Sequence, residues 1–201
     1  YIRYLDEMPG TPIQDVWIDI PPINSQAAER LGYPTQKPLA LLERIIEASS
    51  NPGDVVLDPF CGCGTAVEAA EKLNRKWIGI DITHLAITLI KYRMQGAFPE
   101  AEYQIIGEPW SIGAARHLAQ QNRFQFQWWA LGLVGARPVE QKKGADKGID
   151  GRIVFHEGNP ADPKHIILSV KAGANIGVSM VRDLRGVIER RTDPDDARAI
   201  G

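Results

Sequence analysis

Apolar residues gather in two short runs of strand length, and each run ends in an acidic residue. Val55 to Leu57 lead into Asp58, and Lys76 to Ile80 lead into Asp81. Between the two runs, residues 65–73 have the spacing of a helix and begin with threonine, a good N-cap residue. A strand, a turn, a helix and a second strand, with an acid at each strand end, predict half of a nucleotide-binding α/β unit.

The same patterning predicts the remaining elements. The sequence predicts helices over residues 38–48, 83–94, 111–120, 124–134 and 178–191, and strands over residues 103–107, 152–156 and 165–171. We expect Thr83 to cap the second of these helices, and Lys91 and Arg93 to complement the dipole in its last turn. The composition changes after Pro109, so we expect two α/β domains, residues 1–109 and 110–201.

The turn between the first strand and its helix, Asp58 to Thr65, has the composition of a ligand site. Gly62 and Gly64 allow positive φ and a close approach of the backbone to a ligand. Val67 stands where dinucleotide enzymes have their third glycine, and no Gly-Lys-Ser/Thr follows, which disfavours a dinucleotide or a P-loop nucleotide. A ligand with a ribose but no pyrophosphate fits better, and Asp81 is placed to accept the ribose hydroxyls. This combination points to S-adenosylmethionine.

Three segments, in order and at close spacing, resemble the amino-group DNA methyltransferases of adenine and cytosine: Gly32 to Leu39, Asn51 to Thr65 and Trp77 to Asp81. The resemblance covers about the first half of the chain and is to the permuted class, in which the catalytic motif precedes the cofactor motif. It implies a Rossmann-like fold, with Thr35, Lys37 and Pro38 beside the methionine end of S-adenosylmethionine. The cofactor-binding residues that it implies are Thr35, Lys37, Pro38, Asp58, Pro59, Phe60, Gly62, Gly64, Thr65 and Asp81.

The family's catalytic motif, Asp/Asn-Pro-Pro followed by an aromatic residue, has no convincing match. Asp19-Ile20-Pro21-Pro22-Ile23 has an inserted isoleucine and no aromatic residue, and it lies close to Gly32. We interpret it as a look-alike, because two prolines after an apolar strand commonly form a rigid exit. The catalytic residues for methyl transfer are therefore unknown. We expect the chain to be the C-terminal part of a longer enzyme, cut at both ends, whose N-terminal part is missing.

The second half resembles the restriction-endonuclease-like fold, in particular the Mrr-type nucleases, in the run Gly144 to Gly151 and the hairpin that follows. The resemblance implies Asp150 as a ligand of Mg²⁺ and Lys171 as a catalytic lysine. Ser169 stands where an acid or glutamine is expected, and a hydroxyl binds a hard cation less well than a carboxylate. Gln125 and Gln127 stand where a helical glutamate is expected. We therefore favour a restriction-endonuclease-like domain that is inactive or that only docks on DNA. It remains equally possible that Asp146 and Asp150 are ordinary turn residues without a functional role.

Composition and charge limit the partners. With 44% hydrophobic and 24% charged residues, the chain is an ordinary globular protein, and no run approaches the length of a membrane helix. A net charge of −2 leaves no global basic field, so contact with double-stranded DNA must come from local basic residues, which also serve solubility. The basic residues of the second half that we consider are Lys142, Lys143, Lys147, Arg152, Lys171, Arg182, Arg185, Arg190 and Arg191.

The two cysteines, Cys61 and Cys63, lie inside the glycine turn, and the four histidines form no metal-ligand pattern with them. We therefore interpret both cysteines as small residues that fit a tight turn in a cytoplasmic protein.

The function that follows is a site-specific DNA methyltransferase fragment of the restriction-modification type. Two alternatives stay open. One is an Mrr-like DNA endonuclease whose first half senses the cofactor, and the other is a non-catalytic DNA-binding module with a vestigial cofactor pocket.

Overall fold

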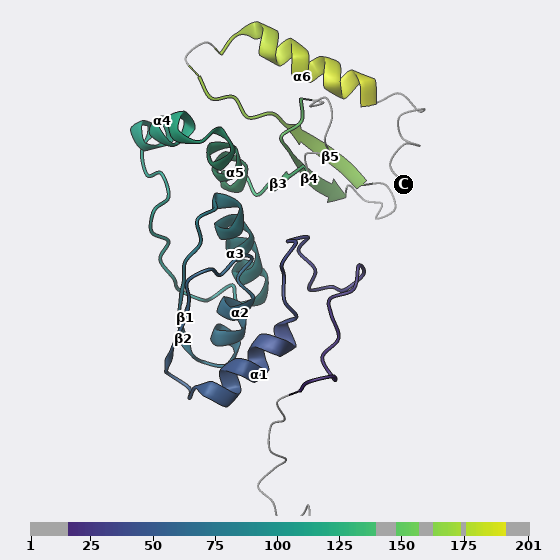
Figure 1. Ribbon diagram of the computed structural model, residues 1–201. Helices are drawn as coiled ribbons and strands as arrows, with labels where there is room; N and C mark the ends of the chain where they lie inside the picture. The colour runs from purple at the N-terminus through teal and green to yellow at the C-terminus, as the bar shows by residue number, and fades with distance from the viewer. Residues whose placement is uncertain (1–15, 140–147, 157–162, 174–175, 192–201) are drawn as a thin grey trace, which may run out of the picture.

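The computed structural model describes residues 16–139, 148–156, 163–173 and 176–191. Its first part is built around two parallel strands, β1 (Val55–Asp58) and β2 (Lys76–Gly79), with Leu57 opposite Ile78. Helix α2 (Thr65–Lys72) connects the strands and packs on both of them (Figure 1). Helices α1 (Leu39–Ser49) and α3 (His84–Ala97) pack against α2. The predicted strand, turn, helix and strand are therefore confirmed.

The core lies on the helical side of the two strands. Val56 and Trp77 pack there against a cluster of Ile46 from α1 with Ala69 and Ala70 from α2. A second cluster joins the glycine turn to α2 and α3 and contains Cys61, Val67, Ile90 and Met94. The small residues of α2 let α1 approach closely, and the larger residues of α3 fill the space beside the turn. Burial of these side chains holds the helices on this face.

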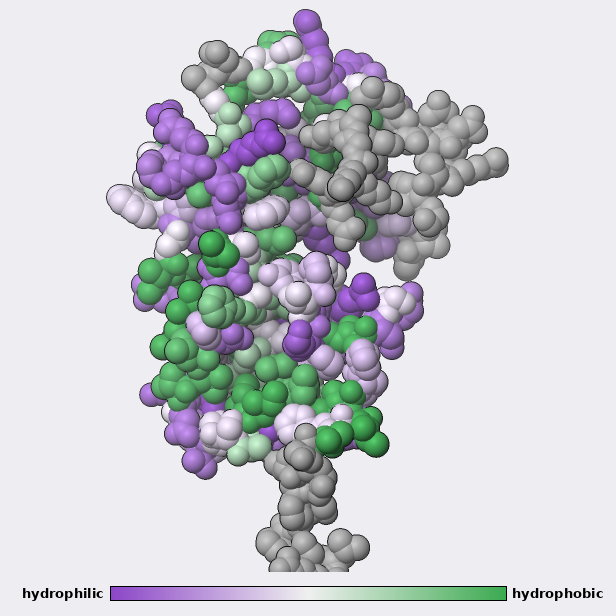
Figure 2. Space-filling view, viewed as in Figure 1, coloured by the Kyte–Doolittle hydropathy of each residue, from purple (hydrophilic) through white to green (hydrophobic). Residues whose placement is uncertain are grey.

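The opposite face of the strands carries apolar side chains that no described element buries. Val55 and Leu57 are each 59% exposed, and Ile78 and Ile80 are each 53% exposed. Figure 2 shows apolar surface along the left of the lower part, where β1 and β2 lie in Figure 1. Parallel sheets in proteins normally have both faces covered. We call these four residues the uncovered sheet face.

The second part begins with two helices, α4 (Ile112–Gln121) and α5 (Arg123–Leu133). An antiparallel sheet follows in the order β3 (Arg137–Pro138), β4 (Gly151–His156) and β5 (Pro163–Leu168), and α6 (Val178–Arg191) comes last. Helix α5 packs on α3, and a Cβ added at Gly132 would lie 2.4 Å from the hydroxyl oxygen of Thr88. The two parts are therefore in close contact through α3 and α5.

Most predicted elements are present with shifted ends, and some details are corrected. Residues 103–107 form no strand. Tyr103 instead packs its ring 5.7 Å from that of Trp77. Gly64 is the N-cap of α2 in place of Thr65, because the left-handed backbone required there suits glycine.

The expectation for Thr83 is confirmed, since its side chain accepts a hydrogen bond from Ala86 N. The expectation for Lys91 and Arg93 is wrong, because α3 continues to Ala97 and its last turn contains neither residue. Lys91 pairs with Glu108, and the guanidinium of Arg93 is buried. Among the described residues, no helix has the length and apolar character needed to cross a bilayer.

Candidate functional site

The glycine turn between β1 and α2 is held tightly in shape. Cys61 N donates to Ile80 O at 2.9 Å, which ties the turn to β2, and Gly64 N donates to Cys61 O at 2.8 Å. Gly62 and Gly64 have φ of 50° and 75°, a region that disfavours other residues. A Cβ added at Gly64 would lie 2.6 Å from Ile90 of α3, so the turn also sits too close to that helix for a side chain.

Asp81, at the end of β2, supports the turn from the side. Its Oδ2 accepts a hydrogen bond from Gly62 N at 3.0 Å. Its Oδ1 accepts from the amide and the hydroxyl of Thr83 at 2.8 and 2.9 Å. A carboxylate has about four acceptor positions, so these three bonds leave about one for a ligand. Asp81 therefore has a structural task beside the ligand contact that the sequence predicts.

An open cavity of about 210 Å³ lies beside the turn. It is lined by the turn on one side and by the segment that precedes α1 on the other, so two distant parts of the sequence meet there. Its lining residues are Tyr33, Thr35, Gln36, Lys37, Leu42, Asp58, Phe60, Cys61, Gly62, Cys63, Thr65 and Ala66. Small-molecule sites commonly have volumes of about 300–1,000 Å³, so this cavity is small for a complete site.

The predicted cofactor residues divide into two groups. Six of them line the cavity: Thr35, Lys37, Asp58, Phe60, Gly62 and Thr65. The other four are not lining residues: Pro38 is the N-cap of α1, Gly64 is the N-cap of α2, Pro59 lies between two lining residues, and Asp81 accepts a hydrogen bond from Gly62 N. Phe60 is 88% exposed, which leaves its ring open to a ligand.

Sequence reasoning missed Tyr33 and Gln36 as lining residues. The ring of Tyr33 lies over the turn, with Cε1 3.0 Å from the position of a Cβ on Gly62. Burial raises the pKa of the Tyr33 hydroxyl, and the negative charge of Asp81 raises it further. Both residues lie inside the segment Gly32 to Leu39 that carries the family resemblance, and this position is the feature of the sequence that could have identified them.

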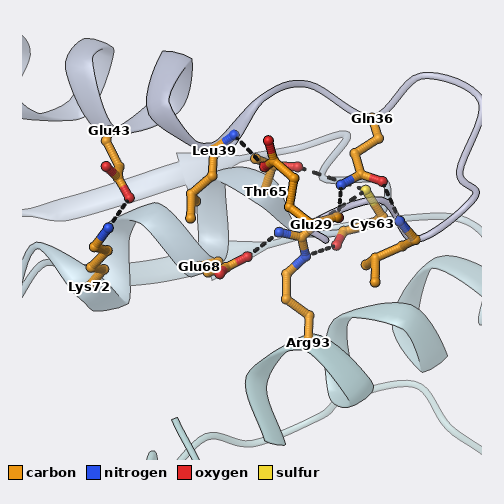
Figure 3. Close-up of polar contacts among 10 residues, drawn as sticks. Glu29, Gln36, Leu39, Glu43, Cys63, Thr65, Glu68, Lys72 and Arg93 are labelled. Atoms are coloured by element: carbon orange, nitrogen blue, oxygen red, sulfur yellow. Dashed lines mark hydrogen bonds and ion pairs between the residues drawn. The ribbon is translucent and has the colours of Figure 1, made fainter. Parts of the chain in front are cut away.

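A small network of hydrogen bonds fixes the segment before α1 (Figure 3). The side chain of Gln36 donates to Glu29 O at 2.5 Å and accepts from Leu31 N at 2.8 Å. The carboxylate of Glu29 accepts from Leu39 N at 2.9 Å and so caps the start of α1, where Pro38 offers no capping side chain. These bonds hold Thr35 and Lys37 against the cavity.

The two cysteines are free and buried, in line with the sequence interpretation. Burial raises the pKa of the Cys61 thiol to about 11, and the charges of Asp81 and Asp58 add to this effect. The thiol of Cys61 is therefore neutral near pH 7, which makes it a poor nucleophile and metal ligand.

Asp19, in the sequence that only resembles a catalytic motif, has both carboxylate oxygens engaged. They accept hydrogen bonds from the Arg44 guanidinium at 2.8 and 2.6 Å. This two-bond contact with Arg44 lowers the pKa of Asp19 to about 2. A carboxylate that is paired in this way fixes the chain to α1 and supports the look-alike interpretation.

In the second half, Asp150 has a role within the sheet. Its Oδ2 accepts from Val170 N at 2.6 Å and from the Ser169 hydroxyl at 3.2 Å, just after the end of β5. Lys171 is exposed and follows these residues. No group of three or more potential metal ligands occurs among the described residues. Asp146 and the lysines 142, 143 and 147 lie outside the described residues.

Gln125 does not serve the Asp150 region. Its side chain accepts from His84 N at 2.8 Å and donates to Ile82 O at 3.2 Å, so it joins α5 to the start of α3. Gln125, which stands where the nuclease resemblance expects a glutamate, is thus engaged with the start of α3.

Comparison with known proteins gives consistent matches for the first half. Residues 3–92 match the family described as DNA methylase. The chain is 41% identical over 101 residues to Type II methyltransferase M.EcaI of Enterobacter cloacae, which covers 50% of this chain and 22% of that protein. It is 44% identical over 98 residues to Type II methyltransferase M.HpaI of Haemophilus parainfluenzae, covering 49% and 31%. It is 54% identical over 68 residues to DNA adenine methyltransferase YhdJ of Escherichia coli (strain K12), covering 34% and 23%.

Among solved structures, the M1.HpyAVI–SAM complex is 42% identical over 35% of each chain, with a TM-score of 0.34. The chain spans between 22% and 31% of the length of the three curated relatives named above. The family match contains β1, the glycine turn, α2 and β2, and it ends within α3. The segment that matches the DNA methylase family, residues 3–92, contains the site described above.

Proposed function

We propose that this chain is the cofactor-binding part of a site-specific DNA methyltransferase of the restriction-modification type. The proposed reaction moves a methyl group from S-adenosylmethionine to the exocyclic amino group of adenine or cytosine in double-stranded DNA. The observation that carries the proposal is the meeting of the glycine turn with Thr35 and Lys37 around one cavity. The matches to Type II methyltransferases and to a DNA adenine methyltransferase support it.

The residues of the site suit S-adenosylmethionine. Asp81 keeps about one acceptor position for a ribose hydroxyl, and the turn places backbone next to the cavity without side chains at Gly62 and Gly64. Lys37 and Thr35 lie on the opposite wall, where their polar groups suit the methionine end of the ligand. The exposed ring of Phe60 offers an apolar surface for the adenine. When bound, the cofactor supplies a methyl group activated by a sulfonium centre.

The proposal includes a further part of the enzyme that precedes the permuted cofactor motif. The uncovered sheet face supports it, because parallel strands with four apolar side chains in water are unfavourable. The small, open cavity supports it as well, since a second wall would enlarge the enclosed site. That part would contribute the groups that hold the target base. We place the enzyme in the cytoplasm, where DNA is accessible to it.

For residues 110–201 we keep the proposal of a small restriction-endonuclease-like domain that docks on DNA. The antiparallel β4–β5 hairpin followed by α6 fits the expected order of elements. Cleavage with Mg²⁺ is the less favoured variant, because Asp150 already accepts two hydrogen bonds from the β5 side. Magnesium-dependent nicking that disappears in Lys171→Ala would favour the nuclease alternative.

Calorimetric titration with S-adenosylmethionine tests the main proposal. We expect saturable binding by the full chain and a loss of affinity of about 10-fold or more in Asp81→Ala, because a hydrogen bond to a charged group contributes about 1.5–3 kcal/mol. Asp54→Ala is the matched control, since Asp54 lies one residue before β1 and does not line the cavity. A folded chain that does not bind, or an Asp81→Ala variant that binds as well as the control, contradicts the proposal.

A further inference from the structure

Arg93 is a buried arginine that the proposed site does not use directly. It lies on α3, and its side chain is only 5% exposed. Its Nε donates to the carbonyl oxygen of Cys63 at 2.9 Å, and its Nη2 lies 3.7 Å from the Cys63 sulfur. Its Nη1 pairs with the carboxylate of Glu68 in the first turn of α2. Figure 3 shows Arg93 reaching from α3 to both partners.

Burying an arginine side chain is unfavourable in free energy unless its charge and its donors are paired. Moving a guanidinium out of water carries a large desolvation penalty, which a single ion pair commonly only offsets. Glu68 supplies the countercharge here, and it is itself mostly buried at 15% exposure. The remaining donors are directed at Cys63, so the side chain brings together α2, α3 and the turn. The planar guanidinium holds its donors in fixed directions toward two partners, whereas the ammonium of a lysine is a single rotatable group on a flexible stem.

The turn has three successive anchors, each from a different source. Cys61 N donates to Ile80 O just after β2, Gly62 N donates to Asp81, and Cys63 O accepts from Arg93. Arg93 is the anchor on the α3 side, and Ile90, three residues earlier on the same helix, contacts Gly64. Because Gly62 and Gly64 have little intrinsic conformational preference, the turn depends on such contacts for a single shape.

We propose that Arg93 is a positioning residue that holds the glycine turn in its ligand-binding conformation. This inference rests on the proposed function, since it assigns Arg93 to the same S-adenosylmethionine site. Arg93 acts through the carbonyl of Cys63 and not through contact with the ligand. A turn that is already in its bound shape loses less conformational entropy on binding, so the anchor raises affinity.

The test compares three variants of the full chain. Arg93→Lys keeps a positive charge near Glu68 but cannot reproduce the fork. Glu68→Gln keeps an acceptor for the guanidinium and leaves the bond to Cys63 in place. Ile46→Ala lowers stability through the α1–α2 cluster, away from the turn, and so controls for a general loss of stability.

Two readouts are needed. Hydrogen exchange in the absence of ligand, followed by NMR, reports the opening of the Gly62 and Gly64 amides. Calorimetric titration with S-adenosylmethionine reports affinity. For Arg93→Lys we expect exchange of these two amides to be about 10-fold faster, with the amides of α1 unchanged, and affinity to fall about 10-fold. For Glu68→Gln we expect smaller changes in both than for Arg93→Lys, because the countercharge is lost but the bond to Cys63 O remains. Ile46→Ala should retain the wild-type affinity.

The outcomes separate this inference from the proposed function. Wild-type protein that is folded and does not bind overturns the proposed function and, with it, the role of Arg93 at this site. Wild-type binding together with unchanged turn exchange or affinity in Arg93→Lys overturns only the inference about Arg93. An equal loss of affinity in Arg93→Lys and Ile46→Ala overturns it as well, because stability alone would then explain the effect.

Discussion

Two charged residues that follow the glycine turn in the sequence anchor it. Asp81 and Arg93 lie 19 residues after Gly62 and 30 residues after Cys63, and each binds one peptide group of the turn. The sequence predicts Asp81 as a ligand contact because an acid at the end of the second strand is recognisable. It does not predict how many hydrogen bonds that carboxylate already accepts. The sequence predicts that Arg93 complements the helix dipole, because only the packing of α3 reveals that its guanidinium is buried.

Asp19 gives a prediction about pH. Its pKa is lowered to about 2, mainly by the hydrogen bonds from Arg44. A carboxyl group with a lowered pKa in the folded state stabilises that state above its unfolded pKa of about 3.9, and this contribution is lost as pH falls toward 2. Carbon-13 NMR of the Asp19 carboxyl should therefore show a midpoint near 2, and the contact with α1 should weaken in the same range.

Arg44→Gln is the matched variant for this titration, because it removes the charge and one of the two parallel bonds. We expect the Asp19 midpoint to return toward the value of an unperturbed aspartate. The Arg44 guanidinium also lies 5.3 Å from the centre of the Trp17 ring, so the fluorescence of Trp17 offers a second readout. A wild-type midpoint near 4 would show that the ion pair does not persist in solution.

At the scale of helices and strands, features set by neighbouring residues can be predicted from the sequence, whereas contacts between residues far apart in the sequence cannot. The two strands, the helix between them and the cap at Thr83 follow from patterns within a few residues. The cap of α1 does not, because Glu29 lies ten residues before the amide that it accepts from. Residues 103–107 have the apolar pattern of a strand but form none, because ladder formation needs a neighbouring strand edge that a pattern cannot guarantee.

The cap of α1 can be tested with Glu29→Ala. The change leaves Leu39 N without its acceptor, and loss of an N-terminal cap commonly costs about 0.5–2 kcal/mol. We expect the free energy of unfolding to fall by about 1 kcal/mol in urea denaturation. The bond from Gln36 to the backbone carbonyl Glu29 O does not need the Glu29 side chain, so the position of Gln36 beside Thr35 and Lys37 should be kept in this variant.

Glu47→Ala is the control for this change. Glu47 is an exposed residue of α1 near the opposite end of the helix, so its loss should alter stability by less than about 0.5 kcal/mol. Equal stability of the Glu29→Ala and Glu47→Ala proteins would mean that the Glu29 carboxylate does not cap α1.

At the scale of the whole molecule, the two halves of the chain are not separated by an extended linker in space. Gly132 of α5 lies so close to Thr88 of α3 that no side chain fits between them, and Gln125 bonds to the first residues of α3. The composition change after Pro109 predicts a domain boundary, and this remains a prediction. A change in residue composition indicates a domain boundary, but it does not indicate whether the two domains pack together. The contact of α5 with α3 depends on surfaces that meet only after folding.

The uncovered sheet face provides the last prediction. Leu57 and Ile78 are cross-strand neighbours and are both more than half exposed, so replacing both with threonine removes little buried apolar surface. Threonine is β-branched, a shape that suits a strand. We expect Leu57→Thr with Ile78→Thr to change the free energy of unfolding of this chain by less than about 0.5 kcal/mol per site, and to reduce binding of an apolar fluorescent dye.

Val56→Thr on the covered face of the same strand is the matched control, because Val56 packs against the α1–α2 cluster. A buried hydroxyl without a partner costs about 1–3 kcal/mol, and Val56 is partly buried against this cluster, so this single change should destabilise the chain more than the double change on the other face. If the double variant loses as much stability as Val56→Thr, the face is already covered within this chain. If it loses little, its apolar residues are available to the further part of the enzyme that we propose, and the same double change should then weaken the assembled methyltransferase.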